Sequence, residues 1–348
     1  MNKKEIIYSL ERGLGRAYIA IRENPEKYKK EVVKTLSVCP AFDPQCEGTR
    51  SFYSYAIFCC YKQPEYFRDI IINRFLRLSP ADCGWNTAYY TEILVDFACD
   101  GDKIAEKALA SKYKTLYDLL WNKKELPNGH FRELDNFEFI CNALSVRMSH
   151  FRRIARDIGR LFLHNTNYDG GSFVWFSHSD YFKRLSRNAD KDECIAAFVN
   201  AVNKYNYEQE ERWRELESDP AYQAERASRR KRYMERELFL EMPLPKTRSD
   251  LEKLLTELET DRENESSWHG FHSDIFEMFK RKNVPKYLKS ALPIIYSTTR
   301  CSFCRQSALC EMGKRRMLTP EILNECLYDS NSDIVKFAKR RLKRITPQ

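Results

Sequence analysis

The sequence contains little glycine and proline, and it has no long apolar run. Its 348 residues include only 11 Gly and 13 Pro, which are too few for the many turns of a β-sandwich or β-barrel of this length. Runs of alternating Val, Ile and Thr, typical of half-buried strands, are also missing. No stretch approaches the roughly 18 apolar residues that a membrane-spanning helix needs. The composition therefore favours an all-α protein without a membrane-spanning segment.

Patterns typical of common enzymes are absent as well. The sequence has no Gly-rich phosphate-binding loop, no G-x-S-x-G and no H-E-x-x-H. The first residues, Met1 to Glu5, lead into an amphipathic helix that carries charges throughout, unlike a signal peptide. We therefore expect a cytoplasmic protein without a cofactor, and an enzyme is the less favoured interpretation.

Cysteine is abundant, with 12 residues, but the spacing is irregular. Most of these cysteines fall within apolar helical stripes, where a thiol acts as a small hydrophobic group. A disulfide framework is typical of short secreted chains. This chain is long and shows no secretion signal, so we expect reduced thiols.

One group of residues has the composition of a metal site: Cys301, Cys304 and Cys310, with His269 and His272 upstream. Zinc is held by four such ligands, and two pairs from neighbouring helices would supply them. However, Cys301 and Cys304 continue into Ala308 and Met312 as one helical stripe. Free cysteine is usually buried. The sequence therefore favours core thiols, and we predict no metal.

The end of the chain predicts two short helices joined by a polar turn. The first carries one apolar stripe at the helical period: Ile322, Leu323, Cys326 and Leu327. Thr319 followed by Pro320 is typical of a helix start. The second helix places Ile334, Ala338 and Leu342 on one face. Neither helix can bury its stripe alone, so the pair must stack on a similar neighbour.

This pair resembles the HEAT/armadillo class of α-solenoid repeats. The resemblance is carried by the turn aspartate and by three positions of the second helix: Asp329, Ile334, Ala338 and Leu342. The basic residue that the family usually has after the β-branched position is replaced by Val335, with Lys336 one position later. The resemblance implies a right-handed α-α superhelix of stacked antiparallel helix pairs. Such a fold does not define an activity.

Helix starts recur at about forty-residue intervals in the N-terminal half, which suits repeats of this class. We therefore predict N-terminal HEAT-like repeats over 1–165 and C-terminal ones over 246–348. Between them, 166–245 is expected to hold a loop and a long charged helical insertion, in which two helices meet near Pro220 and project from the body. The prolines of Met242–Pro245 indicate a linker.

A row of arginines predicts a binding surface. Arg152, Arg156 and Arg160 recur every four residues, opposite an apolar face. In HEAT-like folds the second helix of each pair tends to line the concave surface, so the resemblance implies a groove shared with the terminal helix. That helix carries four basic side chains: Lys336, Lys339, Arg340 and Lys343. Such a groove would suit a phosphate backbone. The alternative is a solvated helix face with partners such as Asp157.

The net charge of +9 is uneven, and more than half of the surplus lies in residues 314–348. Basic clusters bind nucleic acid, acidic proteins or anionic surfaces, and charge alone does not choose among these partners.

Glu92 and Asp96 lie four residues apart in an apolar helix that also contains Tyr89 and Tyr90. A carboxylate in such surroundings is a candidate acid or base. HEAT-like DNA glycosylases use an acidic residue and aromatic residues on a concave surface, but the sequence does not align with their motif. The alternative is an acid pair that bonds helix starts or basic side chains. We assign no catalytic residue.

Two functions fit these observations. The favoured one is a non-catalytic interaction scaffold that binds a protein partner through a solenoid surface. The alternative is a nucleic-acid-binding HEAT-like protein, including a DNA glycosylase-like base-repair enzyme. Salt-dependent retention on DNA would separate the two.

Overall fold

The computed structural model describes residues 1–79, 84–122, 132–148, 150–165, 171–235, 247, 249–254, 265–280, 284 and 286–345. Helices and short connections make up these ranges, and none of their residues lies in a strand. The predicted all-α class is therefore confirmed. Among the described helices, none combines the length and the apolar character that a bilayer crossing requires.

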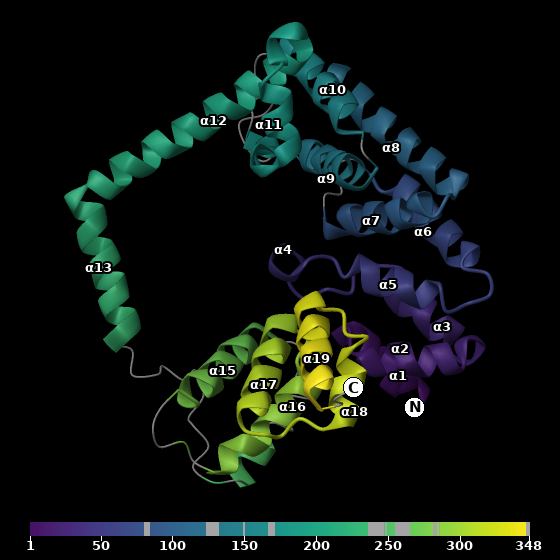
Figure 1. The fold of residues 1–348 in the computed structure, drawn as a ribbon, viewed down its shortest axis with the longest axis vertical. Coiled ribbons are helices and arrows are strands. Elements are labelled where there is room, and N and C mark those ends of the chain that lie inside the picture. The colour runs from purple at the N-terminus through teal and green to yellow at the C-terminus, as the bar shows by residue number, and fades with distance from the viewer. Residues whose placement is uncertain are drawn as a thin grey trace. The chain divides into compact units, whose positions relative to one another are not determined.

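The chain divides into two compact units, whose helices are labelled in Figure 1. Unit 1 joins Met1–Phe67 with Arg236–Gln348, and unit 2 is Arg68–Glu235. The predicted division into 1–165, 166–245 and 246–348 stays a prediction, and the predicted linker Met242–Pro245 lies outside the described residues.

Unit 1 combines helices from both ends of the chain. The N-terminal helices are α1 (Lys3–Arg12), α2 (Gly15–Glu23), α3 (Pro25–Leu36), α4 (Pro44–Glu47), α5 (Ser51–Phe58) and α6 (Glu65–Arg77), in which the division falls. The C-terminal elements are α15 (Glu265–Met278), η3 (Lys286–Ser290), α16 (Ala291–Thr298), α17 (Ser302–Lys314), α18 (Pro320–Cys326) and α19 (Ser332–Ile345).

Helices α18 and α19 are the predicted terminal pair. The Thr319 side chain accepts a hydrogen bond from the Ile322 amide, so the helix begins as its cap predicts. Leu323, Ile334 and Ala338 are fully buried in one apolar cluster with α15, α16 and α17. The stripe periodicity is therefore confirmed for this pair.

Close backbone approach joins the two ends of the chain in unit 1. The Ser330 amide donates to the Gly13 carbonyl at 2.9 Å. Gly13 has a φ of +67°, which favours glycine, and a Cβ on Gly15 would lie 1.9 Å from the Glu325 carbonyl oxygen. Only glycine permits this approach of α2 to α18. A separate link between the two ends of the chain joins α1 to α16, where the Arg12 Nε donates to the Thr298 carbonyl at 2.6 Å.

Unit 2 contains the middle of the chain. Its elements are α7 (Trp85–Cys99), α8 (Lys103–Asn122), α9 (Arg132–Arg147), α10 (Phe151–His164), η1 (Gly171–His178), α11 (Asp180–Ser186), η2 (Ala189–Lys191), α12 (Glu193–Ser218) and α13 (Pro220–Glu235). A Cβ on Gly159 would lie 1.7 Å from the Cys194 carbonyl oxygen, so glycine also sets the close packing of α10 on α12. Phe173 and Phe176 of η1 pack on Phe198 of α12 and are buried.

Helix α12 is only partly packed. Its 26 residues contain four buried side chains, all in the first part of the helix: Ile195, Phe198, Val199 and Val202. No residue from Asn203 to Ser228 is buried, and α13 follows α12 at Pro220 (Figure 1). We call residues 203–235 the arm. The predicted pair of long helices meeting near Pro220 is therefore confirmed.

Candidate functional site

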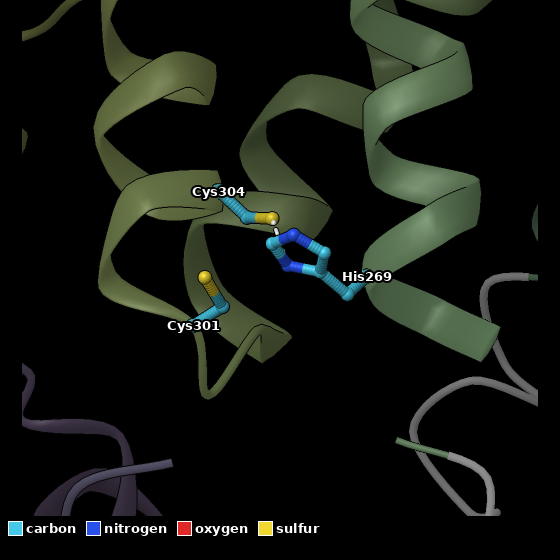
Figure 2. A group of neighbouring side chains, drawn as sticks. All are labelled: His269, Cys301 and Cys304. Carbon is cyan, nitrogen blue, oxygen red and sulfur yellow. Dashed lines mark hydrogen bonds between the residues drawn. The ribbon is translucent and has the colours of Figure 1, made fainter. Parts of the chain in front are cut away.

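The strongest candidate site in unit 1 is formed by His269, Cys301 and Cys304. One ligand atom from each lies within 4.8 Å of the others. The Cys304 Sγ and the His269 Nδ1 are 3.3 Å apart. Figure 2 shows both cysteines at the start of α17 and the histidine reaching them from α15. Cys301 and Cys304 are buried, whereas His269 is exposed.

Local structure explains why these side chains meet. Cys301 is the N-cap residue of α17, and Cys304 follows three positions later on the same helical face. Helix α15 packs against α17 and brings His269 to that face. Farther along the stripe, Ala308 and Met312 belong to the apolar cluster, but the two cysteines do not. The prediction that both thiols are buried is confirmed, and the Cys304 thiol in addition contacts an imidazole.

The other two residues of the predicted grouping lie apart from this group. Cys310 is half-buried farther along α17. His272 is 4% exposed, and neither of its ring nitrogens has a hydrogen-bond partner in the described part of the chain. Burial lowers the pKa of His272 to about 3, and the charge of His269 adds to this effect.

The two thiols are electrostatically unequal. A hydrogen bond from the Cys304 thiol lowers the pKa of Cys301, and the Cys304 backbone amide adds to this effect. The same hydrogen bond, together with burial, raises the pKa of Cys304. The pair therefore favours one thiolate, on Cys301, at a helix start where backbone amides stabilise negative charge.

A pocket of about 660 Å³ opens beside this group. His269, Cys301 and Phe303 form one wall, and Asp43, Cys46 and Glu47 form another. Glu47 is already engaged: it accepts from Arg50 at 2.8 Å and from the Ser302 amide at 2.9 Å. The carboxylate thus ties the segment around α4 to the start of α17 and is not free for a ligand.

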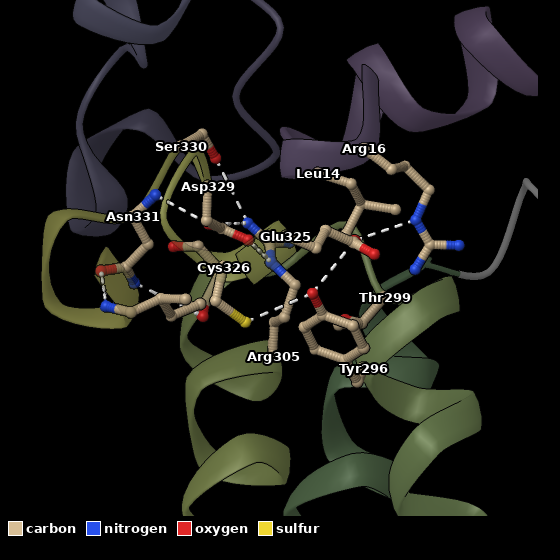
Figure 3. Close-up of polar contacts among 12 residues, drawn as sticks. Leu14, Arg16, Tyr296, Thr299, Arg305, Glu325, Cys326, Asp329, Ser330 and Asn331 are labelled. Atoms are coloured by element: carbon tan, nitrogen blue, oxygen red, sulfur yellow. Dashed lines mark hydrogen bonds and ion pairs between the residues drawn. The ribbon is translucent and has the colours of Figure 1, made fainter. Parts of the chain in front are cut away.

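A second polar cluster lies next to the first in sequence but has a different character (Figure 3). The Arg305 Nε and Nη2 each donate to Asp329 at 2.9 Å, and both side chains are fully buried. Asp329 Oδ1 also accepts from the Asn331 amide at 2.8 Å. Within the Arg305 guanidinium, Nη1 has no hydrogen-bond partner among the described atoms. The cluster joins α17 to the turn before α19, so its role is structural.

In the predicted arginine row, two of the three side chains have carboxylate partners. The Arg156 Nε donates to Asp192 at 2.8 Å, and the Arg160 Nη1 donates to Asp157 at 3.2 Å. Arg152 is exposed and has no ion pair within the described ranges.

The basic residues of the terminal helix are exposed: Lys336, Lys339, Arg340 and Lys343. Lys336 pairs with Asp333 at 3.0 Å. Helix α19 belongs to unit 1, whereas the arginine row belongs to unit 2. A groove that both share stays a prediction.

Asp96, one of the two candidate acids, forms an ion pair with Arg147 that links α7 to α9. Burial raises the pKa of Asp96, and the pair with Arg147 opposes this rise. The pairing matches the interpretation of this acid as a helix-linking residue.

Comparisons with protein-family models, with curated proteins and with solved structures found no match. The described helices define an all-α protein.

Proposed function

We propose that this protein is a non-catalytic interaction protein that binds a protein partner through the arm of unit 2. One observation carries the proposal: α12 and α13 are helical from Asn203 to Ser218 and from Pro220 to Ser228, although no residue from Asn203 to Ser228 is buried in the chain itself. Helical stability in proteins comes mostly from packing of an apolar face. A face supplied by another protein would provide that packing.

The arm offers aromatic anchors for such a partner. Trp213 is 56% exposed, and Tyr205 and Leu216 lie within about 80° of it around the helix, at about 100° per residue. Tryptophan and tyrosine are enriched among the residues that dominate binding energy. An amphipathic helix that presents such anchors suits a hydrophobic groove on a partner.

Charge favours protein over nucleic acid as the partner of this surface. From Asn203 to Ser228, acidic residues outnumber basic ones, and the sequence turns basic only at 229–232. A phosphate backbone needs an excess of positive charge along its path. The paired state of Arg156 and Arg160 further reduces the free positive charge of unit 2.

Two aromatic substitutions on the same helix test the proposal. Trp213→Ala removes the central anchor, whereas Tyr207→Ala removes a side chain that is 61% exposed and lies about 120° away around the helix. A photo-crosslinker at Leu216 should join the chain to one defined protein in cells. We expect Trp213→Ala to abolish this crosslink and Tyr207→Ala to preserve it.

Circular dichroism should show equal helix content for both variants. A crosslink that survives Trp213→Ala unchanged would refute this binding surface. Crosslinking to nucleic acid in place of protein would favour the alternative function.

A further inference from the structure

We propose that His269, Cys301 and Cys304 bind a zinc ion whose fourth coordination position opens on the adjacent pocket. This site is independent of the arm and of the protein binding proposed for it. The proposal also revises the prediction made from the helical stripe, which was that these cysteines are core thiols and bind no metal.

The distances between the donor atoms fit zinc. Zinc bonds of about 2.3 Å to sulfur and about 2.0 Å to nitrogen place neighbouring ligand atoms of a tetrahedron roughly 3.5 Å apart. The Cys304 Sγ and His269 Nδ1 are 3.3 Å apart, and each of the three ligand atoms lies within 4.8 Å of the other two. Small side-chain rotations would therefore complete three edges of a tetrahedron.

The chemistry of the donors selects the class of metal. Two thiolates and one imidazole are soft or borderline ligands, which suit zinc and do not suit magnesium or calcium. The thiol protons that join these groups by hydrogen bonds would be released when a metal binds. Arg305, which follows Cys304 in the sequence, is directed to Asp329, so it is not available to this group.

The backbone holds these ligands on regular elements. Both cysteines sit in the first turn of α17, and His269 lies on α15, which packs against it. Ligands on packed helices need little reorganisation when they bind a metal.

His272 supplies a second observation. It lies near His269 on α15 and is 4% exposed, yet both of its ring nitrogens lack a partner within the described residues. Buried polar atoms are nearly always hydrogen-bonded, so this imidazole, one helical turn from His269, marks the same face of α15 as unusual. It is not itself one of the three converging ligands.

The fourth position faces the pocket of about 660 Å³. Catalytic and ligand-binding zinc sites keep one position for water or a bound molecule, whereas structural sites are closed by a fourth protein ligand. The Glu47 carboxylate is held by Arg50 and Ser302. The Cys46 thiol lines the pocket but is not among the residues that converge. A volume of this size suits a small molecule with an oxygen or nitrogen donor.

Metal content of the purified full-length chain tests the proposal. After reconstitution with Zn²⁺ and removal of excess metal, native mass spectrometry should show one zinc per chain. The double variant Cys301→Ser/Cys304→Ser should bind zinc at least 100-fold more weakly. The matched control Cys310→Ser, on the same helix, should bind as the native chain does. Retention of zinc by the double variant, or absence of zinc from the native chain, would overturn the site.

Two further measurements do not depend on the folding of a cysteine variant. Cobalt bound to the native chain should give the visible absorption of a tetrahedral centre and the ultraviolet band of thiolate ligation. Zinc should protect Cys301 and Cys304, but not Cys59, from alkylation. Octahedral cobalt, or equal alkylation with and without zinc, would contradict the proposal. Cys46→Ser should keep its zinc, and loss of zinc from this variant would show that the fourth position is not open.

Discussion

Two consecutive residues of α17, Cys304 and Arg305, belong to polar clusters of opposite character. Arg305 is fully buried and makes two hydrogen bonds to an equally buried Asp329. Cys304 meets another thiol and an imidazole beside a pocket, with no carboxylate or guanidinium in the group. Where opposite charges pair inside the fold, the cluster stabilises the fold. Where thiol and imidazole side chains converge beside a pocket, their electron pairs make the cluster suited to bind a cation.

The largest expected effect comes from breaking the paired cluster. Arg305→Ala leaves the Asp329 carboxylate buried without its counter-charge, which should cost about 3–5 kcal/mol of unfolding free energy. Urea denaturation followed by circular dichroism measures this loss.

The matched control for Arg305→Ala is Arg16→Ala, which removes a partly exposed arginine that pairs with Glu325 at 2.9 Å. Exposed pairs contribute about 0–1 kcal/mol, so this variant should be close to the native chain. Equal loss of unfolding free energy in both variants would contradict the expected difference between a buried and a partly exposed ion pair.

A smaller loss is expected where α2 meets α18. Gly15→Ala would place a methyl group 1.9 Å from the Glu325 carbonyl oxygen, and because that atom is backbone, the helices must shift. Overpacking of this kind costs about 1–3 kcal/mol. Gly84→Ala meets no atom within 4 Å and serves as the control. A Gly15→Ala midpoint equal to that of the native chain would show that this contact is looser than its distances indicate.

Removing a thiol of the metal group should cost less still when no metal is bound. Cys301 is buried, but it lies at the N-cap of α17 and lines a pocket, so Cys301→Ser should change the unfolding free energy by less than about 1 kcal/mol. Cys141 is fully buried on α9, and a hydroxyl there should cost about 1–3 kcal/mol. Measurements in a chelating buffer compare the two variants. A larger loss of unfolding free energy for Cys301→Ser than for Cys141→Ser would support the interpretation of Cys301 as a core thiol.

The smallest effect is expected for the arginine row. Arg152 and Arg160 are exposed on α10 and Arg156 is half-exposed, so each replacement by glutamine should change stability by no more than about 0.5 kcal/mol. We expect no duplex DNA binding by the native chain at low salt in a fluorescence-anisotropy titration. Binding that falls steeply with salt, and whose salt slope decreases in the triple variant by nearly one per lost phosphate contact, would instead support the nucleic-acid alternative.

The parts that local sequence determines could be predicted. The periodicity of the terminal pair, the cap at Thr319 and the break at Pro220 all act within one or two helical turns, and the structure contains the corresponding helices. The burial of Cys301 and Cys304 follows from the same periodicity.

What the sequence could not show depends on contacts between distant segments. Nothing near Gly15 indicates that α18 approaches it, because the two meet only in the folded chain. The partner of Arg305 was likewise not predicted, although an arginine inside a buried stripe is a signal that a counter-charge is needed. His269 and His272 have the same spacing on α15 as any i, i+3 pair, and only tertiary packing places the first next to the cysteines and buries the second.

The most direct test of the central claim is thermal unfolding of the native chain and of Cys301→Ser, each with and without zinc. A ligand that binds only the folded state stabilises it by about 2.7 kcal/mol at 100 times its dissociation constant. We predict that zinc raises the midpoint of the native chain by several degrees and leaves that of Cys301→Ser unchanged. A midpoint that zinc raises equally in both proteins, or in neither, would contradict the claim that these converging donors form a metal site.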